Sequence, residues 1–348
     1  MSSSAQECFV HIVLPGETEF VTAGRFARAT GAHGIAVGRF VYGRSYLARD
    51  NAVPIDPLEL KLERRFYETT LLQGVFGALR DASPDYWGRR IIERHFGSPG
   101  PGELDCLLYS PDDRAGALGF GLEPQPPAPR RKFNRTIDLG KLQEFADAII
   151  AGEELPQTPD AQRAQELMLK GTSMGGARPK AVVEDDGALW IAKFNRRDDK
   201  WNHARVERTM LMLACECGID TAESRLTTFG DRDALLVKRF NREHAKTGYR
   251  RARMLSALTL LRAGDTHQDR EKWCCVTDWT ALWRDRRKES ILRGPDARGR
   301  ASGLAFGRDP WSAPCCLGIS SSRPYCSALC GAASAGSRAP RTARAPAA

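Results

Sequence analysis

The feature that most constrains this chain is a glycine-rich segment, Gly171-Thr-Ser-Met-Gly-Gly-Ala-Arg-Pro-Lys180, followed by a strand-like run that contains Lys193. Glycines allow backbone N–H groups to approach phosphate oxygens closely, and a lysine on the next strand adds a compact positive charge. An ordinary hairpin turn would show the same glycines, because glycine punctuates many turns. The weight of a phosphate-binding interpretation therefore depends on the residues that follow.

Those residues predict a hairpin, a helix and two further strands. The strands Lys180–Glu184 and Leu189–Phe194 flank Asp185-Asp-Gly187, which is suitable turn chemistry for a hairpin. Arg205–Cys217 predicts a helix that stops at Gly218. The apolar face of this helix consists of Val206, Met210, Leu213 and Ala214, and the following strands are expected at Ser224–Phe229 and Ala234–Phe240.

Lys193 stands in the middle of a strand, where lysine is depleted unless it is paired or at an edge. Glu207 lies on the following helix, on a side that could face the sheet. A strand lysine held by a helix glutamate is how kinases aim the lysine at the α and β phosphates of ATP. The alternative is a surface ion pair of small energetic value. Together with the glycine loop, the pattern favours the functional pair.

The exit of the last strand, Val237-Lys-Arg-Phe-Asn-Arg242, is the third piece of this pattern. A kinase hinge presents backbone donors and acceptors to adenine where a strand passes into a connector. The backbone near Lys238 and Phe240 occupies that place. Any buried strand with a basic exit would look the same, so this segment adds to the pattern without deciding it.

The first half of the chain predicts a small mixed domain. Strands are expected at 9–14, 35–40 and 40–42, and Pro54-Ile-Asp-Pro57 is expected to end their sheet. Helices are expected at about 68–80 and 84–96, the second with Ser83 as N-cap and Pro84 at its first position. Further helices are expected at 139–150 and 254–261, after a proline-rich linker that begins at Glu123.

Composition indicates a globular chain that carries no membrane span or signal peptide, and it therefore predicts a cytoplasmic protein. The net charge of +9 is concentrated after residue 265, so the preceding part is nearly neutral and direct DNA binding is disfavoured. Cys8, Cys106, Cys215 and Cys217 are interpreted as ordinary reduced core thiols. The cysteine spacings match no common zinc pattern.

Residues 266–348 differ in character from the rest. Trp, Cys, Arg, Ala, Gly, Ser and Pro accumulate there without helical or strand periodicity, and no asparagine follows Asn241. A natural disordered tail rarely carries four tryptophans and six cysteines. This composition favours translation of a GC-rich gene in the wrong frame over a genuine divergent tail.

Taken together, the segment from Gly171 to Lys180, Trp190-Ile-Ala-Lys-Phe194, Glu207 and Val237–Arg242 resemble the HipA family, the kinase-like toxins of bacterial type II toxin–antitoxin modules. Two N-terminal segments agree with the family's amino-terminal subdomain, namely Gly77–Arg89 and Tyr109–Leu118. The resemblance implies an α+β, protein-kinase-like fold. Its expected parts are an N-terminal β/α subdomain (1–122), a proline-rich linker (123–135), a kinase-like N-lobe (136–265) and a divergent low-complexity tail, expected to be disordered (266–348) in place of the helical C-lobe.

The resemblance also implies function. Carried over to this sequence, Gly171, Ser173, Gly175, Gly176 and Ala177 would surround the phosphates of ATP, and Ser173 matches a loop serine that can be autophosphorylated. Lys193 would contact phosphates, Glu207 would hold it, and Lys238 and Phe240 would contact adenine. ATP and Mg²⁺ are the implied cofactors. The implied partners are a HipB-like helix-turn-helix antitoxin, which would provide the only link to DNA, and a protein substrate such as glutamyl-tRNA synthetase.

One departure from the family sets the expected activity. The family's catalytic loop has an Asp-His pair flanked by asparagines and a later metal-binding aspartate, and no residues here match them. His267-Gln-Asp269 has the wrong neighbours, and Asp309 is not a credible metal ligand. Phosphoryl transfer depends on positioning and metal charge. The sequence therefore predicts a protein serine/threonine kinase by family that is catalytically impaired. The alternatives are a pseudokinase that binds antitoxin and a small-molecule kinase of related fold.

Overall fold

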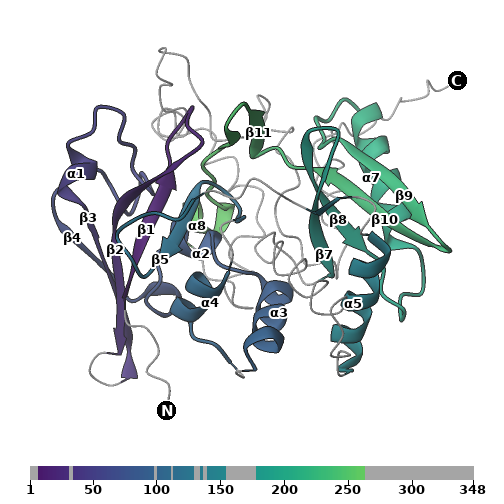
Figure 1. Ribbon diagram of the computed structural model, residues 1–348, viewed down its shortest axis with the longest axis horizontal. Coiled ribbons are helices and arrows are strands. Elements are labelled where there is room, and N and C mark those ends of the chain that lie inside the picture. Colours follow the sequence, from purple (N-terminus) through teal and green to yellow (C-terminus); the bar gives the residue numbers. More distant parts are fainter. Residues whose placement is uncertain are drawn as a thin grey trace, which may run out of the picture.

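The computed structural model describes residues 7–30, 34–97, 100–110, 113–128, 134–135, 139–153 and 178–262. Two five-stranded sheets stand at opposite ends of this part of the chain (Figure 1). Short helices and a two-stranded sheet lie between them. The described residues therefore form a mixed α and β structure dominated by antiparallel pairing.

The N-terminal sheet contains β1 (Glu7–Val13), β2 (Phe20–Thr30), β3 (Ala36–Tyr42), β4 (Phe66–Thr69) and β5 (Leu118–Gly121), with helix α1 (Arg44–Leu47) after β3. Its order is β4-β3-β2-β1-β5, antiparallel throughout. Alternate side chains of β1 enter the core, where Val10 and Ile12 are at most 1% exposed. The strand predicted at 9–14 is confirmed. The strands predicted at 35–40 and 40–42 form the single strand β3.

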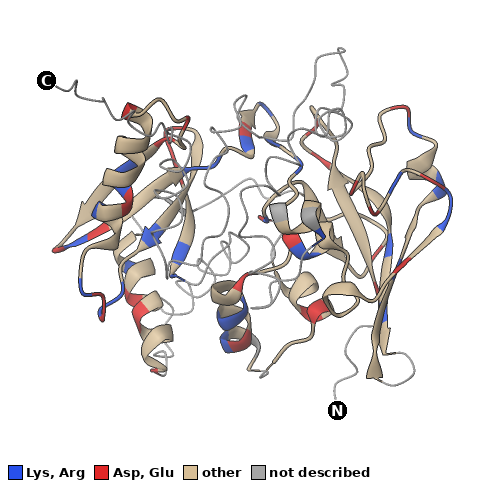
Figure 2. Cartoon of the chain, turned by 180° about the vertical axis from the view of Figure 1, so that it is seen from behind, with Lys and Arg blue, Asp and Glu red and all other residues tan. Residues whose placement is uncertain are grey.

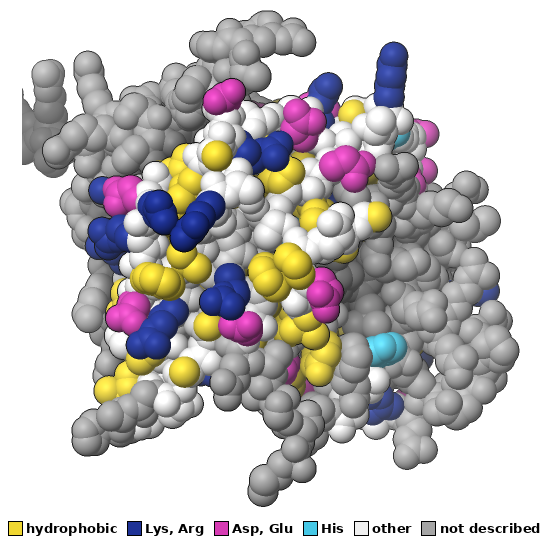
Figure 3. Space-filling view, turned by 60° about the vertical axis from the view of Figure 1, so that its left-hand side comes forward, with side chains coloured by type: hydrophobic (Ala, Val, Ile, Leu, Met, Phe, Trp, Pro, Cys, Tyr) yellow, Lys and Arg dark blue, Asp and Glu magenta, His cyan; other side chains and the backbone are white. Residues whose placement is uncertain are grey.

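The prediction that this sheet ends at Pro54–Pro57 is wrong, because β4 pairs with β3 and β5 pairs with β1 later in the chain. The outer side of this part of the molecule is shown in Figure 3. Apolar, basic and acidic side chains are interspersed on it. The exposed apolar residues of the N-terminal half include Phe66 and Ile35. Figure 2 likewise shows basic and acidic residues interspersed over both sheets.

The helix predicted at 68–80 is also wrong. That stretch holds the end of β4, a single 3-10 turn, η2 (Leu71–Gln73), and the short helix α2 (Gly77–Asp81). The break occurs at Gly74, whose φ of 75° is left-handed. The carbonyl of Gly74 lies so close to Gly38 that a Cβ built on Gly38 would come within 1.9 Å of its oxygen.

The next predicted helix is confirmed as α3 (Tyr86–Phe96), but its N-cap is Asp85 and not Ser83. The Asp85 carboxylate accepts a hydrogen bond from the backbone N–H of Gly88 at 2.7 Å. The predicted apolar face is buried, since Trp87 and Ile91 are each 1% exposed. Helix α4 (Glu103–Tyr109) follows and packs against β1 and β5.

The second sheet contains β6 (Asn134–Arg135), β7 (Lys180–Asp185), β8 (Ala188–Phe194), β9 (Ser224–Phe229) and β10 (Arg232–Lys238), in the order β6-β7-β8-β10-β9. The predicted hairpin is β7 and β8, with Asp186 and Gly187 both at positive φ as a type I′ turn requires. The predicted helix α5 (Leu139–Ala151) is confirmed and covers one face of this sheet.

Helix α7 (His203–Glu216) confirms the helix predicted after β8, and Gly218 beyond it has a φ of 79°. Its predicted apolar face is not buried, since Val206, Met210 and Leu213 are 47–49% exposed. Ala204 is the only buried residue of α7.

After β10 the chain forms a small hairpin, β11 (Arg242–Ala245) and β12 (Gly248–Arg251), and then α8 (Ala257–Leu261), which is shorter than the helix predicted at 254–261. Helix α8 returns to the N-terminal sheet, because Leu255 and Leu260 belong to its core. Thr259 packs directly on Gly77 of α2. The last described residues of the chain therefore pack against its N-terminal half.

The four described cysteines are free thiols of two kinds. Cys8 and Cys106 are buried, and burial raises the pKa of both, to about 12 for Cys8 and about 11 for Cys106. Cys215 and Cys217 are exposed, so interpreting them as core thiols is wrong. Within the described ranges, no helix is long and apolar enough to cross a membrane.

Candidate functional site

The structure brings Lys193 and Glu207 together. The Lys193 ammonium lies 2.5 Å from the Glu207 carboxylate, and both side chains are partly exposed, at 37% and 43%. Lys193 comes from β8 and Glu207 from the second turn of α7. This is the pair that the sequence predicts.

A network of asparagines places α7 so that Glu207 can reach the strand. Asn202 is the N-cap, and its side-chain oxygen accepts from the backbone N–H of Arg205 at 3.0 Å. Asn195, directly after β8, donates to the same Asn202 oxygen at 2.9 Å. Asp233 on β10 then accepts from both Asn202 and Arg205 at 2.6 Å. The start of α7 is therefore fixed to two neighbouring strands.

Lys193 shares one sheet face with Lys180, because the two lysines are directly paired between β8 and β7. We call this the lysine face, and the opposite face is the one covered by α5. Lys180 forms a 2.7 Å ion pair with Asp85, the N-cap of α3, and its side chain is 4% exposed. Burial lowers the pKa of Lys180 and raises the pKa of Asp85. The pair is a buried tie between the two halves of the molecule.

The sequence does not predict this ion pair, although Asp85 and Lys180 both lie in motifs that carry the family resemblance. Trp87 strengthens it by donating its indole N–H to the Lys180 carbonyl at 3.3 Å. A lysine at the first position of a buried strand was the available signal, since such a lysine needs an acidic partner.

The loop residues of the predicted site, Gly171, Ser173, Gly175, Gly176 and Ala177, lie outside the described residues. Lys180, which ends the same motif, is the first residue of β7. The described part of the predicted site therefore consists of Lys193, Glu207, Lys238 and Phe240.

Beyond β10, buried and exposed residues alternate in the segment Lys238–Arg242, which we call the strand exit. Lys238 and Phe240 are exposed, whereas Arg239 and Asn241 are 3% and 5% exposed. Lys238 pairs with Trp190, which lies on the α5 face, so its side chain points away from Lys193. Lys238 could therefore contribute to the same site as Lys193 only through its backbone. The sequence analysis likewise assigns the adenine contact to the backbone near Lys238.

The buried side of the strand exit joins an arginine cluster formed with Asp113 and Arg114. Arg239 lies 2.5 Å from the Asp113 carboxylate, and both side chains are 1% exposed. Arg242 donates to the carbonyls of Gly116 and Arg114 at 2.8 and 2.6 Å. These contacts join residues 113–116 to residues 239–242, which lie more than a hundred positions later in the sequence.

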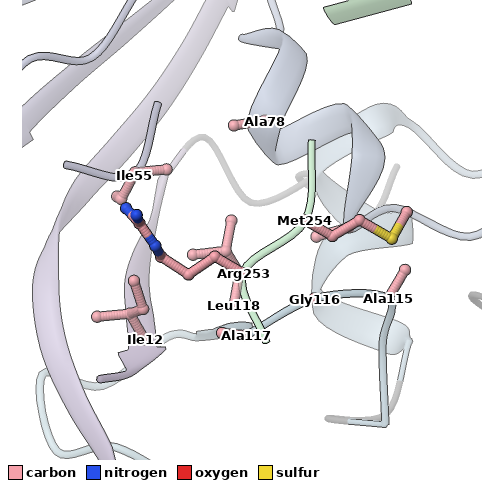
Figure 4. Close-up of a pocket in the computed structure, with 10 residues that line it drawn as sticks. Ile12, Ile55, Ala78, Ala115, Gly116, Ala117, Leu118, Arg253 and Met254 are labelled. Carbon is pink, nitrogen blue, oxygen red and sulfur yellow. The ribbon is translucent and has the colours of Figure 1, made fainter. Parts of the chain in front are cut away.

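A cavity of about 10 Å³ lies in the N-terminal half, between β1, β5 and the segment that precedes α8 (Figure 4). Ile12, Ile55, Leu118, Arg253 and Met254 are among the residues that line it. It has room for roughly one water molecule and is too small for a nucleotide. Across the described ranges, no group of three or more His, Cys, Asp or Glu side chains could hold a metal ion.

Residues 172–290 match a family model described as the HipA-like C-terminal domain. This stretch of the chain is similar to the HipA-like C-terminal domain. The match begins inside the glycine-rich segment and includes Lys193, Glu207 and the strand exit. It also continues past residue 265, where the sequence changes character. The resemblance drawn from the sequence motifs is thereby confirmed for this stretch of the chain.

One solved structure similar to this HipA-like chain belongs to the Shewanella oneidensis MR-1 toxin–antitoxin complex of HipA, HipB and operator DNA. The sequence identity is 17% and the TM-score is 0.45. The alignment covers 71% of this chain and 54% of that chain, so this chain spans about half the length of the structure it matches. No curated protein gives a match.

Proposed function

We propose that this HipA-like chain is a kinase-like protein that binds ATP on the lysine face of its second sheet. The observation that carries the proposal is the 2.5 Å contact between Lys193 and Glu207. A lysine held at one end by a carboxylate has its ammonium fixed in position while part of it stays accessible to a ligand. That is the arrangement required for a phosphate contact that does not first have to order a long side chain.

The roles of the other residues follow from their positions. The glycine-rich segment Gly171–Ala177, which lies outside the described residues, would supply backbone N–H groups to the phosphates. Glu207 orients Lys193 and does not touch the nucleotide. The backbone of the strand exit at Lys238 and Phe240 would meet the adenine ring. When bound, ATP would supply a triphosphate whose negative charge matches the lysine face.

Within the ranges that the structure describes, the residues do not fit the Mg²⁺ site that the family resemblance implies. The described ranges hold no suitable group of ligands, and no asparagine follows Asn241 in the sequence. We therefore propose nucleotide binding without phosphoryl transfer above background for this polypeptide. The HipB-like antitoxin and a protein substrate such as glutamyl-tRNA synthetase stay predictions from the family. Co-purification of the full chain with a HipB-like protein would test the first of them.

The test is ATP binding to the full chain by titration calorimetry, comparing wild type with Lys193→Ala and Glu207→Gln. Removing a charged hydrogen bond to phosphate should weaken ATP binding about 10-fold or more. Glu207→Gln should weaken it less, because the lysine charge remains. Lys141→Ala, which removes an exposed lysine of α5, is the matched control and should bind like wild type. Equal affinities for all four proteins, or no binding by wild type, would refute the proposal.

A parallel assay with [γ-³²P]ATP measures transfer to the chain itself or to a generic protein acceptor. Wild type should incorporate no more label than Lys193→Ala. Incorporation that depends on Lys193 would show that the chain is an active kinase, and the proposed lack of transfer would be wrong.

A further inference from the structure

The arginine cluster joins the N-terminal half to the strand exit, and its contacts also fix the backbone of that exit. We propose that Asp113 is a positioning residue that fixes the backbone of the strand exit and thereby sets selectivity for adenine over guanine. The inference rests on the proposed nucleotide site, since it concerns how that site recognises the base. Its observations are the contacts of Arg239 and Arg242 and the alternation of burial along the exit.

Arg239 is held at three points. Its Nη1 donates to the Asp113 carboxylate at 2.5 Å, its Nη2 donates to the Arg114 carbonyl at 3.0 Å, and its Nε donates to the Asn241 side chain at 3.2 Å. Arg239 and Asp113 side chains are both 1% exposed. A guanidinium is rigid and planar, so three directed contacts fix its position and that of the backbone that carries it.

The N-terminal side of the cluster is itself rigid. Arg114 donates to the carbonyls of Ala82 at 3.1 Å and Ser110 at 2.5 Å, and also to that of Leu107. The loop that carries Asp113 is thereby tied to the end of α4 and to the residue after α2. A displacement of Asp113 would have to break these buried bonds, so Asp113 acts as a fixed point for the strand exit.

Because buried and exposed residues alternate along the strand exit, fixing the buried residues also fixes the backbone of the exposed residues Lys238 and Phe240. The backbone N–H groups of Lys238 and Arg239 bond to the carbonyls of Glu223 and Leu189, both at 2.8 Å, and these are the last ties to the sheet. Beyond them, Asn241 is tied through its carbonyl to Ala252 at 3.1 Å. Phe240 lies between two buried neighbours, Arg239 and Asn241, and is 41% exposed. Its backbone position is therefore set by groups on the opposite, buried side.

Base selectivity is the property that this geometry would control. Adenine and guanine differ in the donors and acceptors on one edge of the ring, and a hinge backbone distinguishes them only when its own groups are correctly placed. The triphosphate contact at Lys193 is the same for ATP and GTP. A change confined to the strand exit should therefore weaken ATP binding while leaving GTP binding unchanged.

The experiment measures the dissociation constants of ATP and GTP for the full chain in wild type, Asp113→Asn and Asp113→Glu. Asp113→Asn removes the charge but keeps an acceptor for Arg239, and Asp113→Glu keeps the charge but displaces it by one methylene. Glu223→Gln is the matched control, because it removes the exposed ion pair of Lys238 from the same segment. We expect wild type and Glu223→Gln to prefer ATP, and both Asp113 variants to lose that preference by about 10-fold.

Equal weakening of ATP and GTP, or an unchanged ratio, would overturn the inference and leave Asp113 a purely structural residue. Should Asp113→Asn fail to fold, Asp113→Glu and hydrogen exchange on wild type decide the matter. ATP should slow amide exchange at 113–116 and 239–242 more than GTP does, and equal effects of the two nucleotides would contradict the proposal. Absence of any nucleotide binding by wild type would instead refute the proposed function, and the inference would fall with it.

Discussion

The ion pair between Asp85 and Lys180 gives a quantitative prediction about how the two halves of the molecule hold together. The pair has a 2.7 Å contact, with side chains 11% and 4% exposed. Breaking a buried pair on one side leaves an uncompensated charge in a poorly solvated place, which costs about 3–5 kcal/mol. Asp85→Asn should therefore lower the free energy of unfolding by about 3 kcal/mol, near the lower end of that range because Asp85 keeps some access to water.

The asparagine variant is the informative one because Asp85 is also the N-cap of α3. Asn and Asp are similarly good caps, so Asp85→Asn removes the charge and keeps the bond from Gly88. Asp85→Ala removes both and should cost about 1 kcal/mol more. In Asp85→Asn/Lys180→Met the buried ammonium is gone, and most of the lost stability should return.

The assay is urea unfolding of the full chain followed by tryptophan fluorescence, since Trp87 donates to the Lys180 carbonyl. With a urea m-value of about 2–3 kcal/mol/M, a loss of 3 kcal/mol lowers the midpoint by roughly 1 M. The reasoning is refuted if Asp85→Asn unfolds within about 0.2 M of wild type. It is equally refuted if the double variant is as unstable as the sum of its single variants, because the two charges would then not be coupled.

Two further predictions concern α2 and its contact with α8. Gly77→Ala should destabilise the protein by about 1–3 kcal/mol, because the added Cβ would lie 2.6 Å from the Thr259 side chain. The control is Gly140→Ala on α5, where the nearest atom is 4.0 Å away and helix propensity should make the change neutral or stabilising. Thermal unfolding compares the two, and a Gly77→Ala protein as stable as wild type would contradict the packing. Asp81 accepts a bond from the backbone N–H of Ser256 at 2.6 Å, and burial raises its pKa. Since the folded state favours the protonated form, its contribution to stability is full below the ordinary carboxyl pKa and is lost as pH rises through the raised value. Asp81→Asn should therefore gain stability relative to wild type as the pH rises above the ordinary carboxyl pKa of about 4, and a pH-independent difference in unfolding midpoint would contradict this account.

Local signals in the sequence were sufficient for the elements that carry the candidate pair. The hairpin of β7 and β8 was predictable because Asp186 and Gly187 both accept positive φ. Helices α5 and α7 follow from their apolar periodicity. The contact of Lys193 with Glu207 was predictable because only one helix separates the two strand pairs, so a lysine in mid-strand has few acidic partners within reach.

Strand β2 was missed for a physical reason that lies in its pairing. The register with β1 shifts between Val10 and His11, which marks a bulge. Phe20, Ala23 and Phe26 are buried, so the buried positions change phase within the strand. The alternation of buried and exposed residues that indicates a strand is therefore interrupted at that point. The helix predicted at 68–80 failed through the close approach of Gly74 and Gly38, which no local pattern reveals.

Two ion pairs next to the candidate site could not be predicted from the sequence because they join distant segments. Asp85 meets Lys180 at the start of β7, and Asp113 meets Arg239 at the end of β10. In each case a carboxylate of the N-terminal half neutralises a cation at an end of a strand of the second sheet. Each cation adjoins one part of the predicted site in the sequence, the glycine-rich segment in one case and the strand exit in the other. Desolvation makes each pair intolerant of partial separation. The N-terminal half therefore determines where both ends of the candidate nucleotide site stand, and a second sheet expressed without it should lose the order of that site together with its stability.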